Sequence, residues 1–245
     1  MAKESDKKNG RAKRTILKIW KWSKRIFIWI FILQLFYIVL LKWINPPITM
    51  TQFVSWVSGH GLKRDYVSRK NISPNAKLAV IAAEDQLFPD HDGFDWKSIK
   101  KAMAYNQKKP GRIRGGSTIS QQVAKNVFLW QGRSWIRKGL EVYFTFMIEK
   151  VWGKKRILEV YLNVIEMGEG IFGIEMAANK YYNKPAKTLT TQESARIAAC
   201  LPNPKKYGSR LPSPYVSFRA RNIMQQMSNL QTDPDIQRLT GLIPP

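Results

Sequence analysis

The first strong pattern along the chain is a continuous apolar run near its beginning. Sixteen uncharged residues extend from Ile26 to Leu41, and two more apolar residues follow Lys42. Because a lysine ammonium group can reach the membrane surface from such a position, the pattern predicts one transmembrane helix at residues 26–44. A cleaved signal peptide is the alternative, but residues 42–55 contain no small-x-small cleavage site. The sequence therefore favours a retained signal anchor.

The rest of the chain carries helix caps and breaks, and no alternating apolar and polar runs typical of strands. We therefore expect a mainly α domain at residues 73–230, after a proline-interrupted connector at 45–72 and before a C-terminal tail at 231–245. The predicted helices of this domain lie at 73–84, 95–107, 118–126, 134–152, 154–163, 170–184, 194–201 and 213–230. The helix starts are indicated by Ser73-Pro74, Asp95, Ser134, a capping box at Thr190-Thr191-Gln192-Glu193, and Ser213-Pro214. In the helix at 134–152, the residues expected on the core side are Val142, Phe144, Phe146, Met147 and Ile148.

A short amphipathic segment, Gln52 to Leu62, precedes the domain. Two interpretations are open for its apolar side chains, which are those of Phe53, Val54, Trp56, Val57 and Leu62. They can line a protein core or contact lipid. Of the two, the core is favoured.

The charge of the chain is strongly positive, with 41 Lys and Arg against 17 Asp and Glu and a net charge of +24. Ten of the basic residues and only two of the acidic ones precede residue 26. The positive-inside rule places residues 1–25 in the cytoplasm as a basic tail, and the chain beyond residue 44 outside. A positive domain tethered to a membrane is expected to meet lipid headgroups or a lipid-linked anion, and nucleic acid is an improbable partner.

Cysteine and histidine are scarce. Cys200 is the single cysteine, which excludes an internal disulfide, and His60 and His91 are the only histidines. These three residues do not supply the closed sphere of a structural zinc site. A metal ion in this protein would therefore need carboxylate ligands, which favours magnesium, manganese or calcium.

The first chemical stretch is the end of the apolar helix at 73–84. That helix ends in the adjacent carboxylates Glu84 and Asp85, and the chain then turns before Asp95 begins a new helix. Burial among small apolar residues raises the proton affinity of a carboxylate, which suits Glu84 to accept a proton near neutral pH. The alternative is an acidic pair on an ordinary surface, although two acids at a helix C-terminus oppose the helix dipole.

The second chemical stretch is Gly115-Gly116-Ser117-Thr118, which opens a helix. Two glycines allow close approach of the backbone to a ligand, Ser117 or Thr118 caps the helix, and free N–H groups at a helix start attract anions. A helical repeat places on one face the polar side chains of Thr118, Gln121, Gln122 and Lys125. The stretch predicts a phosphate site, with a plain N-cap as the alternative.

Arg137 and Glu141 form an i, i+4 pair on the helix at 134–152. Such a pair is in many proteins only a surface ion pair worth a few tenths of a kcal/mol.

Five ordered motifs of this chain resemble those of the peptidoglycan glycosyltransferases, glycosyltransferase family 51. They run from about Leu78 to Pro204 and are Glu84-Asp85-x-x-Phe88-x-x-His91-x-Gly93-x-Asp95, Gly115-Gly116-Ser117-Thr118-Ile119-x-Gln121-Gln122-x-x-Lys125-Asn126, Arg137-Lys138-x-x-Glu141, Lys154-x-x-Ile157-Leu158-Glu159-x-Tyr161-Leu162-Asn163 and Gly170-x-x-Gly173-Ile174-x-x-Ala177-Ala178-x-x-Tyr181. One anchor and no second domain before residue 245 point to the monofunctional, biosynthetic branch.

The resemblance implies a lysozyme-like fold with a small hydrophobic lobe beside the membrane. It implies polymerisation of lipid II onto a nascent glycan strand at the outer, periplasmic face of the bacterial inner membrane, with β-1,4 linkage, inversion and release of undecaprenyl pyrophosphate. Membrane lipids and other cell wall synthesis proteins are the expected partners. The alternative activity is that of a lytic transglycosylase or lysozyme-like muramidase.

The resemblance also implies residue roles. Glu84 is expected to be the general base, and Glu141 the second important carboxylate, which holds a divalent cation such as Mg²⁺ or Mn²⁺ or orients basic side chains. The expected pyrophosphate-binding residues are Ser117, Thr118, Gln121, Gln122, Lys125, Arg133, Arg137 and Lys138. Supporting positions in the motifs are Asp85, Phe88, His91, Lys154 and Glu159.

Overall fold

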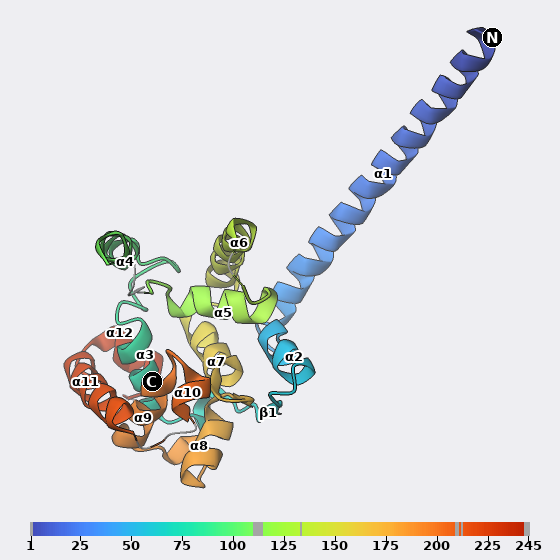
Figure 1. Ribbon diagram of the computed structural model, residues 1–245. Helices are drawn as coiled ribbons and strands as arrows, with labels where there is room; N and C mark the ends of the chain where they lie inside the picture. The colour runs from blue at the N-terminus through green and yellow to red at the C-terminus, as the bar shows by residue number, and fades with distance from the viewer. Residues whose placement is uncertain (1, 110–114, 133, 209–210, 212, 243–245) are drawn as a thin grey trace. The chain divides into compact units, whose positions relative to one another are not determined.

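The computed structural model describes residues 2–109, 115–132, 134–208, 211 and 213–242. Its contacts divide the chain into two units, Met1–Ile44 and Asn45–Pro245, which we describe separately. Helices make up most of the described residues, as expected for a mainly α protein (Figure 1).

The first unit is one long helix, α1 (Ala2–Leu40). Its part from Ile16 to Leu40 is 25 residues long and apolar enough to cross a membrane. A helix of that length extends about 37 Å at 1.5 Å per residue, more than the roughly 30 Å of a hydrocarbon core. Most large apolar side chains between Ile16 and Phe36 are exposed, as lipid contact requires. The helix includes the basic tail predicted at residues 1–25, and it ends four residues before the predicted boundary at residue 44.

The second unit is organised around α3 (Pro74–Glu84), an almost wholly buried helix. Ser73 caps it by accepting a hydrogen bond from the N–H of Asn75, and Pro74 follows where no N–H is needed, as predicted. Seven consecutive residues from Ala76 to Ala82 are buried. α3 packs against α9 (Thr191–Cys200), α11 (Pro214–Leu230) and α12 (Pro234–Thr240) (Figure 1).

A second group of helices packs around α5 (Ile119–Phe128). It contacts α6 (Trp135–Val151) and α7 (Lys154–Val164), and it also contacts α2 (Met50–Val57). The remaining helices are α4 (Trp96–Lys108), α8 (Ile174–Tyr182) and α10 (Pro204–Gly208), with short 3₁₀ turns at Arg69–Asn71 and Ala186–Thr188. On α6 the prediction of a core side was partly wrong, because Val142 and Phe146 are exposed while Ile148 is buried.

The helix predicted at 170–184 was wrong at its start, because residues 171–172 form a strand of a small sheet and the helix begins at Ile174. Three short strands, β1 (Lys63–Arg64), β2 (Glu166–Gly168) and β3 (Ile171–Phe172), form a sheet in the order β1-β3-β2. β1 is parallel to β3, and β2 is antiparallel to it. Strands of two or three residues are too short to show a period-two pattern. Glycine is required beside them: a Cβ on Gly170, where φ is +64°, would lie 2.1 Å from the carbonyl oxygen of His60.

The prediction that the apolar side of the segment at 52–62 lines a core was wrong. Phe53, Val54, Trp56 and Val57 of α2 are all exposed, whereas the polar Gln52 and Ser55 are buried. Two polar groups of this side are paired inward: the Gln52 side-chain oxygen shares a capping box with Thr49, and the Ser55 hydroxyl donates to the carbonyl of Gly61 at 2.8 Å. The apolar side is left outward, the arrangement that lipid contact would use.

The tail predicted at 231–245 contains a helix that the sequence analysis missed. Asp233 caps α12 by accepting hydrogen bonds from the N–H groups of Asp235 and Ile236, and Pro234 is its first residue. This Asp-Pro pair is the same start signal that was read correctly at Ser73-Pro74.

α12 meets α3 at a buried charge. Lys77 is 5% exposed, and its ammonium group donates to the carbonyl oxygen of Thr240 at 3.2 Å. Burial and the nearby Arg69 lower the pKa of Lys77 to about 8, and Glu159 opposes them. An ammonium group at the last carbonyls of α12 is placed where the helix dipole favours a cation.

This lowered pKa predicts how stability depends on pH. The folded pKa of about 8 is below the ordinary value of 10.5, so between those pH values the unfolded state binds more protons and stability rises with pH. Between pH 7 and 10 we expect the native protein to gain about 2 kcal/mol relative to Lys77→Met. Melting temperatures of both proteins in detergent, measured at several pH values, would test this. A constant difference across the range would contradict it.

Candidate active site

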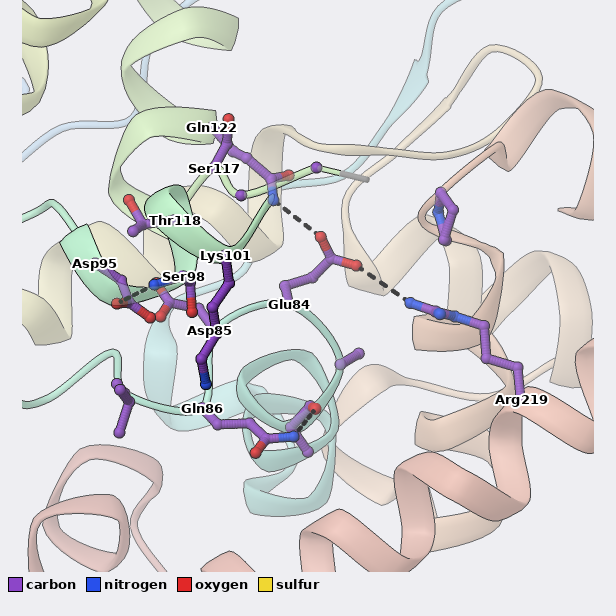
Figure 2. A pocket seen from close by; sticks show the side chains of 16 residues that line it. Glu84, Asp85, Gln86, Asp95, Ser98, Lys101, Ser117, Thr118, Gln122 and Arg219 are labelled. Atoms are coloured by element: carbon purple, nitrogen blue, oxygen red, sulfur yellow. Dashed lines mark hydrogen bonds and ion pairs between the residues drawn. The ribbon is translucent and has the colours of Figure 1, made fainter. Parts of the chain in front are cut away.

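Glu84 is the last residue of α3, and its carboxylate is held from two sides (Figure 2). The side-chain amide of Gln122, in the second turn of α5, donates to Glu84 Oε2 at 2.9 Å. Gln122 Oε1 in turn accepts from the hydroxyl of Tyr161 on α7 at 3.2 Å. The Glu84 carboxylate, which only accepts when ionised, fixes which end of the amide faces it, because a flipped amide would bring two oxygens together; the Tyr161 hydroxyl then donates to the amide oxygen.

Arg219 reaches Glu84 from the other side. Its Nη2 lies 3.8 Å from Glu84 Oε1, an ion pair that the sequence analysis did not find. Arg219 lies on α11, after all five motifs, and 135 positions of sequence separate the partners. A basic residue on an amphipathic helix gives no local signal that distinguishes it from a surface arginine.

The pKa of Glu84 is raised above its ordinary value, mainly by burial. The Gln122 hydrogen bond and the Arg219 charge lower it, and the neighbouring charge of Asp85 raises it further. Burial likewise holds the pKa of Tyr161 well above its ordinary value, so this residue stays a hydroxyl donor. The sequence prediction that Glu84 is desolvated at the end of an apolar helix agrees with this environment.

Asp85 has a different role from its neighbour. Its carboxylate accepts from the backbone N–H of Ile119, the first residue of α5, at 2.9 Å, and lies 3.0 and 3.1 Å from Nε2 of His91. The buried Phe88 packs edge-on against the His91 ring. Asp85 therefore connects the end of α3 to the start of α5, and is 7% exposed.

Lys154 and Glu159 support the structure around this site. Lys154 donates to the backbone carbonyl of His91 and to the carboxylate of Glu149, which fixes the turn after α3. Glu159 accepts from the N–H of Arg69 at 2.9 Å and from Arg156, so it holds the connector. Neither residue contacts Glu84 among the interactions of the described residues.

A cleft of about 890 Å³ opens beside Glu84. Of the predicted site residues it brings together Glu84, Ser117, Thr118 and Gln122 (Figure 2). Its other charged lining groups are those of Asp85, Asp95, Lys101 and Arg219. The cleft is large enough for a ligand of several sugar units or their equivalent.

The start of α5 differs from the free anion site that the sequence suggested. Thr118 caps the helix and forms a capping box with Gln121, and the Thr118 hydroxyl donates to the carbonyl of Gly93 at 2.7 Å. With Asp85 on the N–H of Ile119, these groups are satisfied within the protein. Thr118 and Gln121 are both buried, whereas Ser117 is exposed. The polar face predicted for this helix is therefore divided, and only part of it is free for a ligand.

A second cavity of about 430 Å³ shares part of its lining with this cleft. Gln122 lines both cavities, and Lys125 lines only the second one. The other lining residues are mostly polar and include Thr51, Ser55, Ser58, His60, Asn126, Gln131, Glu166 and Lys205. Lys125 is thus one helical turn from Gln122, in the neighbouring cavity.

Glu141 lies at the centre of a basic cluster. It accepts from Arg137 at 2.7 Å and from Lys138, and it is 3% exposed, so this is more than a surface ion pair. Burial lowers the pKa of Lys125. The charge of Glu141 raises this pKa, and the charges of Arg137 and Lys138 lower it. The remaining predicted binding residue, Arg133, lies outside the described residues.

The surroundings of Glu141 do not fit a divalent cation in this arrangement. Its carboxylate oxygens already accept from two cationic side chains, and the described residues contain no group of three or more His, Cys, Asp or Glu that could hold a metal ion. Of the two roles considered for Glu141, the orientation of basic side chains matches these contacts.

A family model and individual relatives indicate the same protein family for this chain. The family model described as Transglycosylase matches residues 50–228. A biosynthetic peptidoglycan transglycosylase of Yersinia pseudotuberculosis is 48% identical over 225 residues, which cover 89% of this chain and 93% of the relative. Proteins of the same name from Salmonella paratyphi B and Escherichia coli are 56% and 54% identical over 182 and 190 residues, covering 73% and 76% of this chain and 75% and 78% of the relatives.

Asp85 provides a test of how the site is assembled. Asp85→Ala would leave the N–H of Ile119 and the His91 ring without their carboxylate, at a cost of roughly 2–4 kcal/mol in unfolding free energy. For a domain of this size that is a fall of roughly 5–15 °C in melting temperature. The control is Asp90→Ala, since Asp90 is exposed. Equal melting curves for the two variants would show that Asp85 does not join α3 to α5.

Proposed function

The chain belongs to the transglycosylase family, and on that premise we propose that it polymerises lipid II into β-1,4-linked glycan strands, with inversion and release of undecaprenyl pyrophosphate. Family membership makes it a peptidoglycan glycosyltransferase, an enzyme of bacterial cell wall synthesis. The observation that carries the mechanism is the position of Glu84: a partly desolvated carboxylate on a large cleft, held by a residue that also lines a second cavity.

In this mechanism Glu84 is the general base. Its Oε1 takes the proton of the GlcNAc 4-hydroxyl of the acceptor lipid II while that oxygen forms a bond to the anomeric carbon of the donor MurNAc. The bond from that carbon to the pyrophosphate oxygen breaks from the opposite face, which inverts the configuration. A carboxylate whose pKa is raised by burial is a stronger base than one in water, and its proton affinity is better matched to neutral pH.

The leaving group of this reaction is already an anion, so electrostatic stabilisation serves it better than a proton. We assign this role to Lys125, because it lines the second cavity and lies one turn from Gln122 on α5. Arg137 and Lys138 are held on Glu141 and would support Lys125 by maintaining a positive potential. Ser117 presents an exposed hydroxyl to the cleft at the glycine-rich turn.

The location we propose is the outer, periplasmic side of the bacterial inner membrane. α1 has one segment able to span a membrane, and the basic residues before residue 26 favour a cytoplasmic N-terminus. Lipid II and the nascent strand carry polyprenyl chains, so a tethered enzyme meets them at the bilayer surface. Membrane lipids are the proposed environment of the exposed apolar side of α2, and other wall-building proteins are the proposed partners.

The direct test is incubation of the detergent-solubilised protein with labelled lipid II, followed by digestion with a muramidase. Polymer that the muramidase cuts would support synthesis. Anhydro-sugar products from added cell wall, without polymer from lipid II, would instead indicate a lytic enzyme.

Glu84→Gln should lower polymerisation by about two to four orders of magnitude, because the amide cannot accept the proton and the other two carboxylates of the cleft, those of Asp85 and Asp95, already accept from backbone N–H groups. The fold should be retained, since glutamine has nearly the same shape. The rate of polymer formation from labelled lipid II measures this, with Glu169→Gln, an exposed change, as the control. Polymer made by Glu84→Gln near the native rate would remove Glu84 from the role of base.

Lys125→Ala should cost about 2–4 kcal/mol of transition-state stabilisation, a loss of roughly 30- to 1,000-fold in kcat/KM, by analogy with removal of one preorganised donor. Lys187→Ala, on an exposed 3₁₀ turn, is the matched change of charge. Steady-state kinetics with lipid II would measure kcat/KM for both variants, and only Lys125→Ala should show the loss. Native kinetics for Lys125→Ala would show that another group stabilises the pyrophosphate.

A further inference from the structure

The feature that the family motifs leave unexplained is Arg219, on the wall of the cleft opposite Gln122 (Figure 2). We propose that Arg219 is a positioning residue of the transferase reaction, which holds the Glu84 carboxylate as an anion with Oε1 turned toward the acceptor hydroxyl. This inference rests on the proposed role of Glu84 as the general base.

The geometry separates the two oxygens of Glu84. Oε2 accepts a hydrogen bond of 2.9 Å from Gln122, and Oε1 faces Arg219 Nη2 at 3.8 Å. That second distance is short enough for charge attraction and too long for a hydrogen bond. Among the described residues, Oε1 therefore has no hydrogen-bond donor and keeps a lone pair for the substrate proton, and the charge of Arg219 favours its ionised form.

Arg219 is itself held without saturating its donors. It comes from α11, which packs against both α3 and α9, so its backbone is tied to the helix that carries Glu84. Its Nε is buried and has no hydrogen-bond partner within the part of the chain that the structure describes. Glu84 provides the ion-pair contact of this guanidinium among those residues.

Several charges face Glu84, and Arg219 is the cation that lies within 4 Å. Asp85, from the same chain segment, opposes ionisation of Glu84, as does burial; Gln122 of α5 and Arg219 of α11 favour it. Tyr161 of α7 faces the site as a neutral hydroxyl. Asp95 and Lys101 line the same cleft from the α4 side. Loss of Arg219 would leave burial and Asp85 opposed only by one amide, so the carboxylate would take up a proton at higher pH.

The experiment is a pH profile of kcat/KM for polymerisation of labelled lipid II by the full-length protein in detergent. Arg219→Gln removes the charge and Arg219→Lys keeps it. Arg221→Gln is the matched control, because Arg221 is exposed on the same helix and does not line the cleft. Glu84→Gln is measured in the same series, and circular dichroism melting curves report the fold of each variant.

For Arg219→Gln we expect the acidic limb of the profile to move to higher pH by about one unit. At pH values on the acidic side of the limb, kcat/KM should fall by about tenfold, and at pH 9 it should change little. Arg219→Lys and Arg221→Gln should keep the limb near its native position. If Arg219→Gln proves unstable, the pH profile of Arg219→Lys still tests the proposal. A shift of its acidic limb by as much as one pH unit would show that the positive charge at this position does not set the ionisation of Glu84.

Two outcomes would overturn the inference, and they are distinguishable. An equal loss at every pH, with the limb unmoved and KM raised, would mean that Arg219 binds an anionic group of the substrate or supports the fold. In that case inactivity of Glu84→Gln would leave the proposed base intact. Polymerisation by Glu84→Gln at the native rate would instead remove the premise, and with it the role of Arg219.

Discussion

The hydrogen bond from Gln122 to Glu84 is the interaction on which the site depends, because it links the catalytic end of α3 to α5. Glu84 and Asp85 are consecutive, yet they hold different points of α5: Glu84 meets a side chain in its second turn, and Asp85 meets its first backbone N–H. Two attachments one turn apart fix both the position and the rotation of α5 relative to α3. Without the Gln122 amide, the burial of Glu84 would be opposed only by the charge of Arg219, and the ionised carboxylate would be more costly.

The division of labour between these two acids follows from their partners. Asp85 is saturated by the Ile119 N–H and the His91 ring, so it is a structural link. Glu84 lines the cleft, and within the described part of the chain its Oε1 accepts no hydrogen bond. The capping box of Thr118 and Gln121 satisfies N–H groups at the start of α5 within the protein. The next residue, Gln122, lines the cleft and donates to Glu84. A rigid set of paired groups thus surrounds one reactive oxygen.

Sequence alone predicted the features that local chemistry determines. Ser73, Asp95, Thr118, Ser134, Thr190 and Ser213 all cap helices in the structure, because a cap needs only neighbours two or three residues away. The desolvation of Glu84 was also accessible from the small apolar residues before it. The ion pair of Arg219 with Glu84 could not be predicted in this way, because it depends on the packing of α11 against α3. The residues next to Arg219 in the sequence do not indicate that contact. For the same reason the burial of α2 was misjudged: its polar side pairs with Asn126 and Tyr66, partners that periodicity does not reveal.

The shared wall between the two cavities has a consequence for inhibitor design. A compound that fills only the larger cleft can leave the Gln122 amide in place, whereas one that bridges both cavities must pass around it or push it aside. Displacing the amide would strip Glu84 of its N–H donor and Tyr161 of its acceptor at once, so a bridging molecule has to replace both contacts with polar atoms of its own to bind tightly.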